Sequence, residues 1–152
     1  MSTNIPNTVT LPKDRGDHPT KLQQSESGFK APTRLHENLQ RVLVDLINLH
    51  LVAKQAHWNV VGANFRDLHL NLDDVVDVAR EGSDVVAERM RALHATPDGR
   101  PSVVAGQSSL PEFSDGEIST HDAIRAMVRA VEACVGTMRT VHDEVDADDP
   151  AS

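Results

Sequence analysis

Apolar residues recur at alternating spacings of three and four along three long stretches of the chain, the pattern of helices packed side by side. The first stretch predicts a helix over residues 33–59, with a buried seam of Leu35, Leu39, Val42, Leu46, Leu49 and Ala53. The second predicts a helix from Asn64 to Leu93 or His94, with a core face of Phe65, Leu68, Leu72, Val75, Val76, Ala79, Val86, Met90 and Leu93. The third begins at Ser119 or Thr120 and continues to Val145, with a buried side of Ile124, Met127, Val128, Val131, Val135, Met138, Val141, His142 and Val145. Together these stretches predict an all-α fold.

The connections between the helices predict their arrangement. Gly62 and the small residues near it break the pattern after the first helix, which places a short turn there. Residues 95–118 are punctuated by Pro and Gly and are too long for a tight hairpin, although a short helix or turn can interrupt them. Such a crossover can run back along a whole helix, so the second and third helices should be parallel, as in ferritin-like four-helix bundles.

The helix ends complete this prediction. Thr33 after Pro32 is the predicted N-cap of the first helix. Asp149 and Pro150 have the pattern of an N-cap and first residue of a further helix, and the sequence stops there. The predicted fold is therefore a ferritin-like four-helix bundle over residues 33–152 whose fourth helix is missing, so that the domain is incomplete at its C-terminus. Residues 1–32 contain four prolines and little apolar periodicity, and are predicted to be a flexible arm with Phe29 as a candidate anchor.

Composition narrows the class of protein. The 152 residues suffice for one domain, and 39% hydrophobic residues with no Tyr and one Trp favour a helical fold. A net charge of −8 argues against a dedicated nucleic-acid binder, although the arm has a balance of +1 and a DNA-binding tail remains the alternative to a plain flexible terminus. No stretch has the length of a membrane span or the apolar run of a signal peptide, so we expect a cytoplasmic protein. The single cysteine, Cys134, is predicted to be a small buried residue.

Five side chains in residues 57–88 are candidate metal ligands: His57, His69, Asp73, Asp84 and Glu88. His57 falls near the end of the first helix and the other four on one face of the second, spread over about 100°. They form two pairs, because Asp73 and Asp84 are separated by roughly 16 Å along the helix axis. One ion with ligand bonds of about 2 Å cannot bridge that gap.

The numbering shows how the two pairs can meet. The pairs His69 with Glu88 and Asp73 with Asp84 are both centred on the bond between residues 78 and 79. If two copies of this helix cross antiparallel about a two-fold axis there, each pair is joined across the axis. This predicts a metal site shared between subunits, two per dimer, with His57 completing each one. On spacing alone, a solvated acidic face is the alternative.

The same centre places Asp77 opposite Arg80 of the other copy, which predicts an ion pair across the axis. Gly82 costs about 1 kcal/mol within a helix relative to Ala, and close approach of another backbone near the axis would explain it. As a ligand, a neutral His57 would need its other ring nitrogen held by a hydrogen-bond acceptor. His50, on the same helix edge, is predicted to be an ordinary satisfied histidine.

The stretch KQAHWNVVGANFRDLHLNLDD, followed by SDVVAERMRAL, resembles the Dps family (DNA-binding protein from starved cells, a ferritin-like miniferritin), in its actinobacterial type. The resemblance is close from Leu35 to Leu93 and looser in the third helix. It places the five candidates on the family's ferroxidase ligands, which the family builds across two-fold interfaces. It also matches Trp58 to a tryptophan beside the site, where it can shield the chemistry, donate an electron or simply pack.

The resemblance implies a hollow dodecamer that oxidises Fe(II) at di-iron sites, with hydrogen peroxide or dioxygen, and stores the ferric product. Imidazole and carboxylate ligands suit both iron valences. In the family, residues near the junction after the third helix line a pore, so Asp146, Asp148 and Asp149 are candidates, with a solvated acidic end as the alternative. Two other functions stay open: a DNA-protecting protein of the nucleoid, and a zinc-binding helical dimer without redox chemistry.

Overall fold

The computed structural model describes residues 31–152, so the predicted arm and Phe29 lie outside it except for the last residues of the arm. Three long helices carry the fold: α1 (Thr33–Asn59), α2 (Phe65–Ala92) and α4 (Thr120–Asp148). A short helix, α3 (Pro101–Gln107), interrupts the crossover, and two-residue strands follow α1 (β1, Val60–Val61) and precede α4 (β2, Ile118–Ser119). None of the helices in the described part has an apolar stretch long enough for a bilayer crossing.

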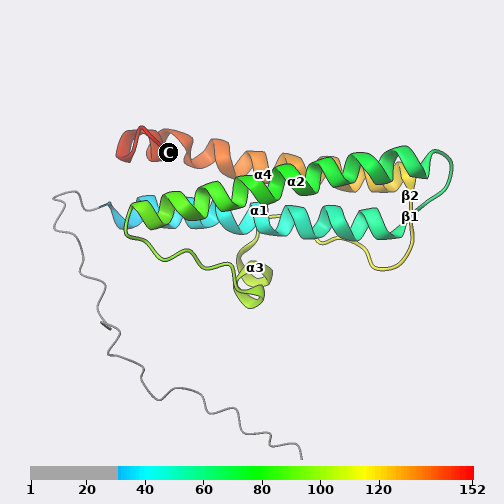
Figure 1. Cartoon of the computed structure of the whole chain (residues 1–152), viewed down its shortest axis with the longest axis horizontal. Helices are drawn as coiled ribbons and strands as arrows, with labels where there is room; N and C mark the ends of the chain where they lie inside the picture. Colours follow the sequence, from blue (N-terminus) through cyan, green and yellow to red (C-terminus); the bar gives the residue numbers. More distant parts are fainter. Residues whose placement is uncertain (1–30) are drawn as a thin grey trace, which may run out of the picture.

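The long helices lie side by side, and α1 packs against both α2 and α4. In Figure 1, α2 and α4 both start at the β1–β2 end of the molecule and run toward the opposite end, antiparallel to α1. The predicted parallel arrangement of the helices on either side of the crossover is therefore confirmed. The predicted bounds of all three helices agree with the structure within three residues.

A pair of parallel strands, which the sequence did not reveal, fastens the two loops at one end of the bundle. Val60 pairs with Ile118 and Val61 with Ser119. Gly62 follows at φ +115°, a backbone conformation that L side chains rarely adopt, which explains the glycine at this turn. Because β2 leads directly into α4, this pairing fixes the start of α4 beside the end of α1.

A buried carboxylate holds the crossover onto the helices. Asp45 of α1 is 1% exposed. One of its oxygens accepts from the Ser109 N–H at 2.7 Å and from Ser108 Oγ at 3.1 Å, and the other accepts from Ser109 Oγ and Thr137 Oγ1, both at 2.6 Å. The charge is thus fully hydrogen-bonded, as burial requires. This cluster joins α1, the segment after α3, and α4.

The predicted seam of α1 is buried throughout, and so is Cys134. The predicted faces of α2 and α4 are partly wrong, because five of their members are exposed: Phe65 (52%), Ile124 (50%), Val128 (50%), Val131 (37%) and His142. Three of these line an apolar groove between α2 and α4: Ile124, Val128 and Val131. A second apolar pocket shares Val131 and has Leu46 and Leu49 of α1 in its lining. Periodicity therefore identified an apolar face correctly, but within residues 31–152 no helix covers it.

The helix ends also differ in part from prediction. Pro32, not Thr33, stands at the N-cap of α1, and no side chain caps that end. Ser119 does cap α4, because its Oγ accepts from the Asp122 N–H at 3.1 Å. Asp149 is the C-cap of α4, and its carbonyl accepts from the Ser152 N–H at 3.0 Å in a single turn. The predicted further helix beyond Pro150 stays a prediction.

Candidate metal centre

The two candidate histidines hold each other through reciprocal hydrogen bonds. Nδ1 of His57, on the last turn of α1, lies 2.8 Å from the carbonyl oxygen of His69. Nδ1 of His69, on the second turn of α2, lies 2.9 Å from the carbonyl oxygen of His57. The two rings stack with centroids 3.6 Å apart and an angle of 23° between their planes.

These contacts determine which nitrogen of each ring is free. A carbonyl oxygen can only accept, so Nδ1 of each ring must donate its proton there. In a neutral imidazole Nε2 then carries the lone pair, which is the nitrogen that a metal requires. The predicted need for an acceptor behind His57 is met by the backbone of His69. The turn between α1 and α2 therefore orients both imidazoles before any metal is present.

Asp73 lies beside this pair and is held by a lysine. Its Oδ1 is 3.1 Å from Nδ1 of His57 and 2.6 Å from Nζ of Lys54. The hydrogen bond from Lys54 lowers the pKa of Asp73, and the positive charge of Lys54 acts in the same direction. Sequence reasoning did not identify Lys54. Its position one turn before His57, as the single lysine of residues 31–152, could have drawn attention to it.

A groove of about 640 Å³ opens next to Asp73 on the face shared by α1 and α2. Two large apolar side chains of α1 line it while exposed, Leu51 at 50% and Trp58 at 68%. His50 also lines it, and the prediction that His50 is satisfied is wrong, because its Nδ1 is buried with no hydrogen-bond partner in the described chain. Burial, and then the charge of Arg80, lower the pKa of His50, so the ring is held neutral.

Asp84 and Glu88 stand apart from the other three candidates. Both are exposed on α2, about three and four turns beyond Asp73. Among residues 31–152 neither side chain takes part in a hydrogen bond or an ion pair, whereas that of Asp73 contacts Lys54 and His57. Within that part of the chain no three side chains of His, Cys, Asp or Glu are arranged so that they could hold a metal ion. One copy of the chain thus brings three of the five predicted ligands together and leaves the other two exposed.

Two of the three pore candidates are paired within the chain. Asp148 accepts from Arg34 of α1 at 2.7 and 3.1 Å. Asp149 is 8% exposed and pairs with Arg89 of α2, whose hydrogen bond lowers the pKa of its carboxyl. Asp146 is exposed. The two arginines therefore hold the end of α4 against α1 and α2, and the pore role of these acids stays a prediction.

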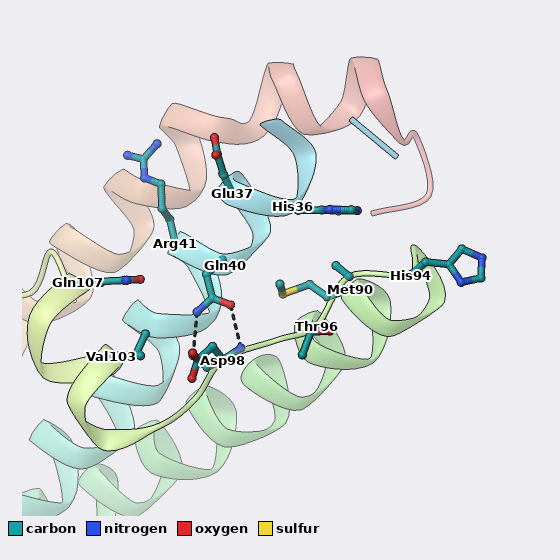
Figure 2. A pocket seen from close by; sticks show the side chains of 11 residues that line it. His36, Glu37, Gln40, Arg41, Met90, His94, Thr96, Asp98, Val103 and Gln107 are labelled. Atoms are coloured by element: carbon teal, nitrogen blue, oxygen red, sulfur yellow. Dashed lines mark hydrogen bonds between the residues drawn. The ribbon is translucent and has the colours of Figure 1, made fainter. Parts of the chain in front are cut away.

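A second cavity, of about 660 Å³, lies at the opposite end of the bundle and contains none of the predicted site residues. Figure 2 shows it between the first turns of α1, the end of α2 and the crossover. The Gln40 amide bridges the backbone of Asp98 there, donating to its carbonyl at 2.8 Å and accepting from its N–H at 2.9 Å. This arrangement anchors the crossover rather than building a reactive site.

Comparison with known proteins gives consistent matches. The Ferritin-like domain family matches residues 36–152. The DNA protection during starvation protein of Agrobacterium fabrum is 30% identical over 141 residues, covering 92% of this chain and 82% of that protein. The fine tangled pili major subunit of Haemophilus ducreyi is 38% identical over 59% of this chain and 47% of its own length. Dps from Microbacterium arborescens, solved in a high iron form, superposes with a TM-score of 0.72 at 34% identity, covering 76% of each chain.

Several of these matches cover only part of the relative, so the activity of the whole relative is not assigned to this chain by the match alone. The chain spans about half the length of several curated relatives that it matches. Across the described part, the matches agree with the helical architecture.

Proposed function

The chain belongs to the Dps family of ferritin-like proteins, and on that premise we propose that it oxidises Fe(II) at sites shared between two copies and stores the ferric product. The reciprocal contact between His57 and His69 carries this proposal, because it leaves both Nε2 atoms free to bind a metal. The high iron form described for the Microbacterium arborescens protein supports iron as the substrate. Assembly as a dodecameric cage belongs to the proposal, and the actinobacterial type and the cytoplasmic location stay predictions.

Each group has a separate task in the proposed reaction. His57, His69 and Asp73 of one copy would supply one side of the site, because the fold already holds them close together. Asp84 and Glu88 of a second copy would complete the shell, and their carboxylates favour the harder Fe(III). Two ferrous ions give one electron each to hydrogen peroxide, its O–O bond breaks, and two protons convert the products to two waters. Trp58, exposed beside Asp73, would shield the site or supply an electron.

Association of two copies would use the face that holds the groove beside Asp73. Leu51 and Trp58 are exposed there, and burying such apolar area favours association. Arg80 and Asp77 line the same groove, as the predicted cross-axis ion pair requires. The groove therefore supports binding of a second copy on the side of the molecule that carries Asp73.

DNA protection is the alternative function, and the charge of the described residues does not favour direct DNA contact by them. Residues 31–152 hold 11 Lys and Arg against 20 Asp and Glu, a balance of −9 (11 − 20). Phosphate contacts need basic surface. Gel retardation of DNA across a salt series tests this role. A zinc dimer without turnover is the third candidate, tested by metal analysis of the purified protein.

Complementation tests the shared site directly. One variant carries His69→Ala and Asp73→Asn, and the other carries Asp84→Asn and Glu88→Gln. Each alone should oxidise Fe(II) slowly when ferric absorbance is followed after peroxide addition. When the two are mixed during assembly, about a quarter of the wild-type rate should return, since about half of the dimers are mixed and each holds one intact site.

His142→Ala, which removes an exposed imidazole of α4, is the matched control and should leave the rate unchanged. A mixture as inactive as its components would contradict a site shared between copies. Full oxidation by the His69→Ala, Asp73→Asn variant alone would contradict the assignment of these ligands altogether.

A further inference from the structure

Lys54 occupies an unusual place for a cation in this chain. All ten other basic residues of the described part are arginines, and Lys54 is the one lysine. It points from α1 to Asp73 on α2, and its Nζ reaches Oδ1 at 2.6 Å. The same oxygen is the one that lies 3.1 Å from the His57 ring. An ammonium therefore already holds the carboxylate on which the proposed site depends.

We propose that Lys54 is a resident counter-cation, which keeps Asp73 oriented while the site is empty and must release it when a divalent cation binds. This inference rests on the proposed function, since it takes Asp73 as a ligand. A metal ion and the ammonium would compete for one carboxylate oxygen, and their positive charges repel at such a distance. Lys54 thereby lowers the affinity of the site for metal, and its release accompanies binding.

The chemistry of lysine suits a cation that has to leave. An ammonium makes a single point contact on a flexible stem, whereas a guanidinium would grip the carboxylate in two parallel hydrogen bonds. In a single copy the Lys54 and Asp73 side chains are 32% and 42% exposed, so water can replace their contact there at small cost. Elsewhere the chain uses arginine for contacts that hold helices together, as Arg89 does with Asp149.

The groove beside Asp73 gives the released side chain a place to go. Lys54 lines it together with Asp77, one turn further along α2 than Asp73. Asp77 is exposed, and among residues 31–152 its side chain takes part in no ion pair or hydrogen bond. A lysine that leaves Asp73 can thus move toward a second carboxylate without crossing the core, and in the proposed dimer it would share Asp77 with Arg80 of the other copy.

Binding of Zn²⁺, which has no redox chemistry, tests the inference without any measurement of iron oxidation. Titration calorimetry on the metal-free assembled protein compares wild type with Lys54→Met, which keeps the length of the side chain and removes its charge. Lys54→Met should bind Zn²⁺ about two- to fivefold more tightly, because a partly exposed ion pair contributes little. Lys54→Gln is the second variant, and circular dichroism verifies that both fold.

Arg139→Met removes one positive charge from an exposed position of α4 and should leave Zn²⁺ affinity unchanged. In an Asp73→Asn background, Lys54→Met should have no effect, as a double-mutant cycle requires of a direct competition. Unchanged or weaker Zn²⁺ binding by both Lys54 variants would overturn the inference while leaving the site intact. If Asp73→Asn itself leaves Zn²⁺ affinity unchanged, the proposed site fails instead.

Discussion

Within a single chain, the two parts of the predicted ligand set differ in their contacts and in their exposure. His57, His69 and Asp73 are drawn together from two helices, and each has a hydrogen-bond partner. Asp84 and Glu88 come from one helix, are exposed, and have no such partner among residues 31–152. The turn at Gly62 explains the first group, since it returns α2 alongside α1 and brings His57 to His69.

The contrast shows which part of the site the monomer's own folding can organise. The two histidines have defined ring orientations within one chain, whereas isolated carboxylates on a solvated face depend on a partner for their geometry. Stability and activity should therefore respond differently to substitutions in the two groups.

The largest expected effect is the loss of Fe(II) oxidation when either group of ligands is replaced, and the two groups should differ in how much stability is lost with it. Asp84→Asn with Glu88→Gln should lower peroxide-driven Fe(II) oxidation about 100-fold or more, yet change the unfolding free energy by less than about 0.5 kcal/mol. His57→Ala should abolish oxidation as well and cost about 1–3 kcal/mol, because it removes a buried ring and its hydrogen bonds. Denaturant unfolding and initial rates provide both numbers. Equal stability losses would erase the distinction between the groups.

Arg80→Glu should separate the two copies and so leave each half-site incomplete. If Arg80 faces Asp77 of a second copy, the substitution places like charges together and weakens the dimer by about tenfold or more. Sedimentation or light scattering should show a smaller particle, and iron oxidation should fall with it. Adding Asp77→Arg on the same chain should restore association. A particle of unchanged mass would argue against the predicted axis.

Arg89→Met should loosen the end of α2 that carries Glu88 without affecting the histidines. Its partner Asp149 has a pKa below the ordinary 3.8, so the contact stabilises the fold above that value and loses this effect as pH falls through the lowered pKa. The unfolding free energy of wild type should exceed that of the variant by about 1 kcal/mol near neutral pH, and the difference should vanish in strong acid. Unfolding free energies measured from pH 7 to pH 2 test this, with the exposed Asp146→Asn as control.

Gly82→Ala should have the smallest effect, and its sign distinguishes the chain from the dimer. Within the chain a Cβ at Gly82 would meet Leu46 at 3.5 Å, an ordinary contact. Alanine should therefore stabilise the isolated chain by about 0.5–1 kcal/mol through helix propensity. If a second backbone passes close to Gly82, association should weaken at the same time. Urea unfolding and a dilution series separate these effects.

Sequence periodicity predicted the helices and their directions because every long helix repeats its apolar positions over many turns. It could not predict which apolar face is covered, so Ile124 and Val128 were placed in the core although they border a groove. The strand pair of Val60 with Ile118 was missed because two residues carry no periodic pattern.

The common face of the four candidates on α2 could be predicted because, in an ideal helix, the spacing of two residues fixes the relative direction of their side chains. The exchange of carbonyl contacts between His57 and His69 was not, since it depends on how the turn closes. The contact of Lys54 could not be predicted for a similar reason, because its partner Asp73 lies 19 residues away on another helix.

The burial of Cys134 has a consequence for a protein proposed to handle an oxidant. Removal from water, and secondarily the negative charge of Asp45, raise the pKa of its thiol to about 11. At neutral pH only about one thiol in ten thousand is then ionised, and the ionised form is the nucleophile that attacks peroxide. The lone sulfhydryl should thus survive repeated exposure without forming sulfenic acid, and chains should not become cross-linked through sulfur.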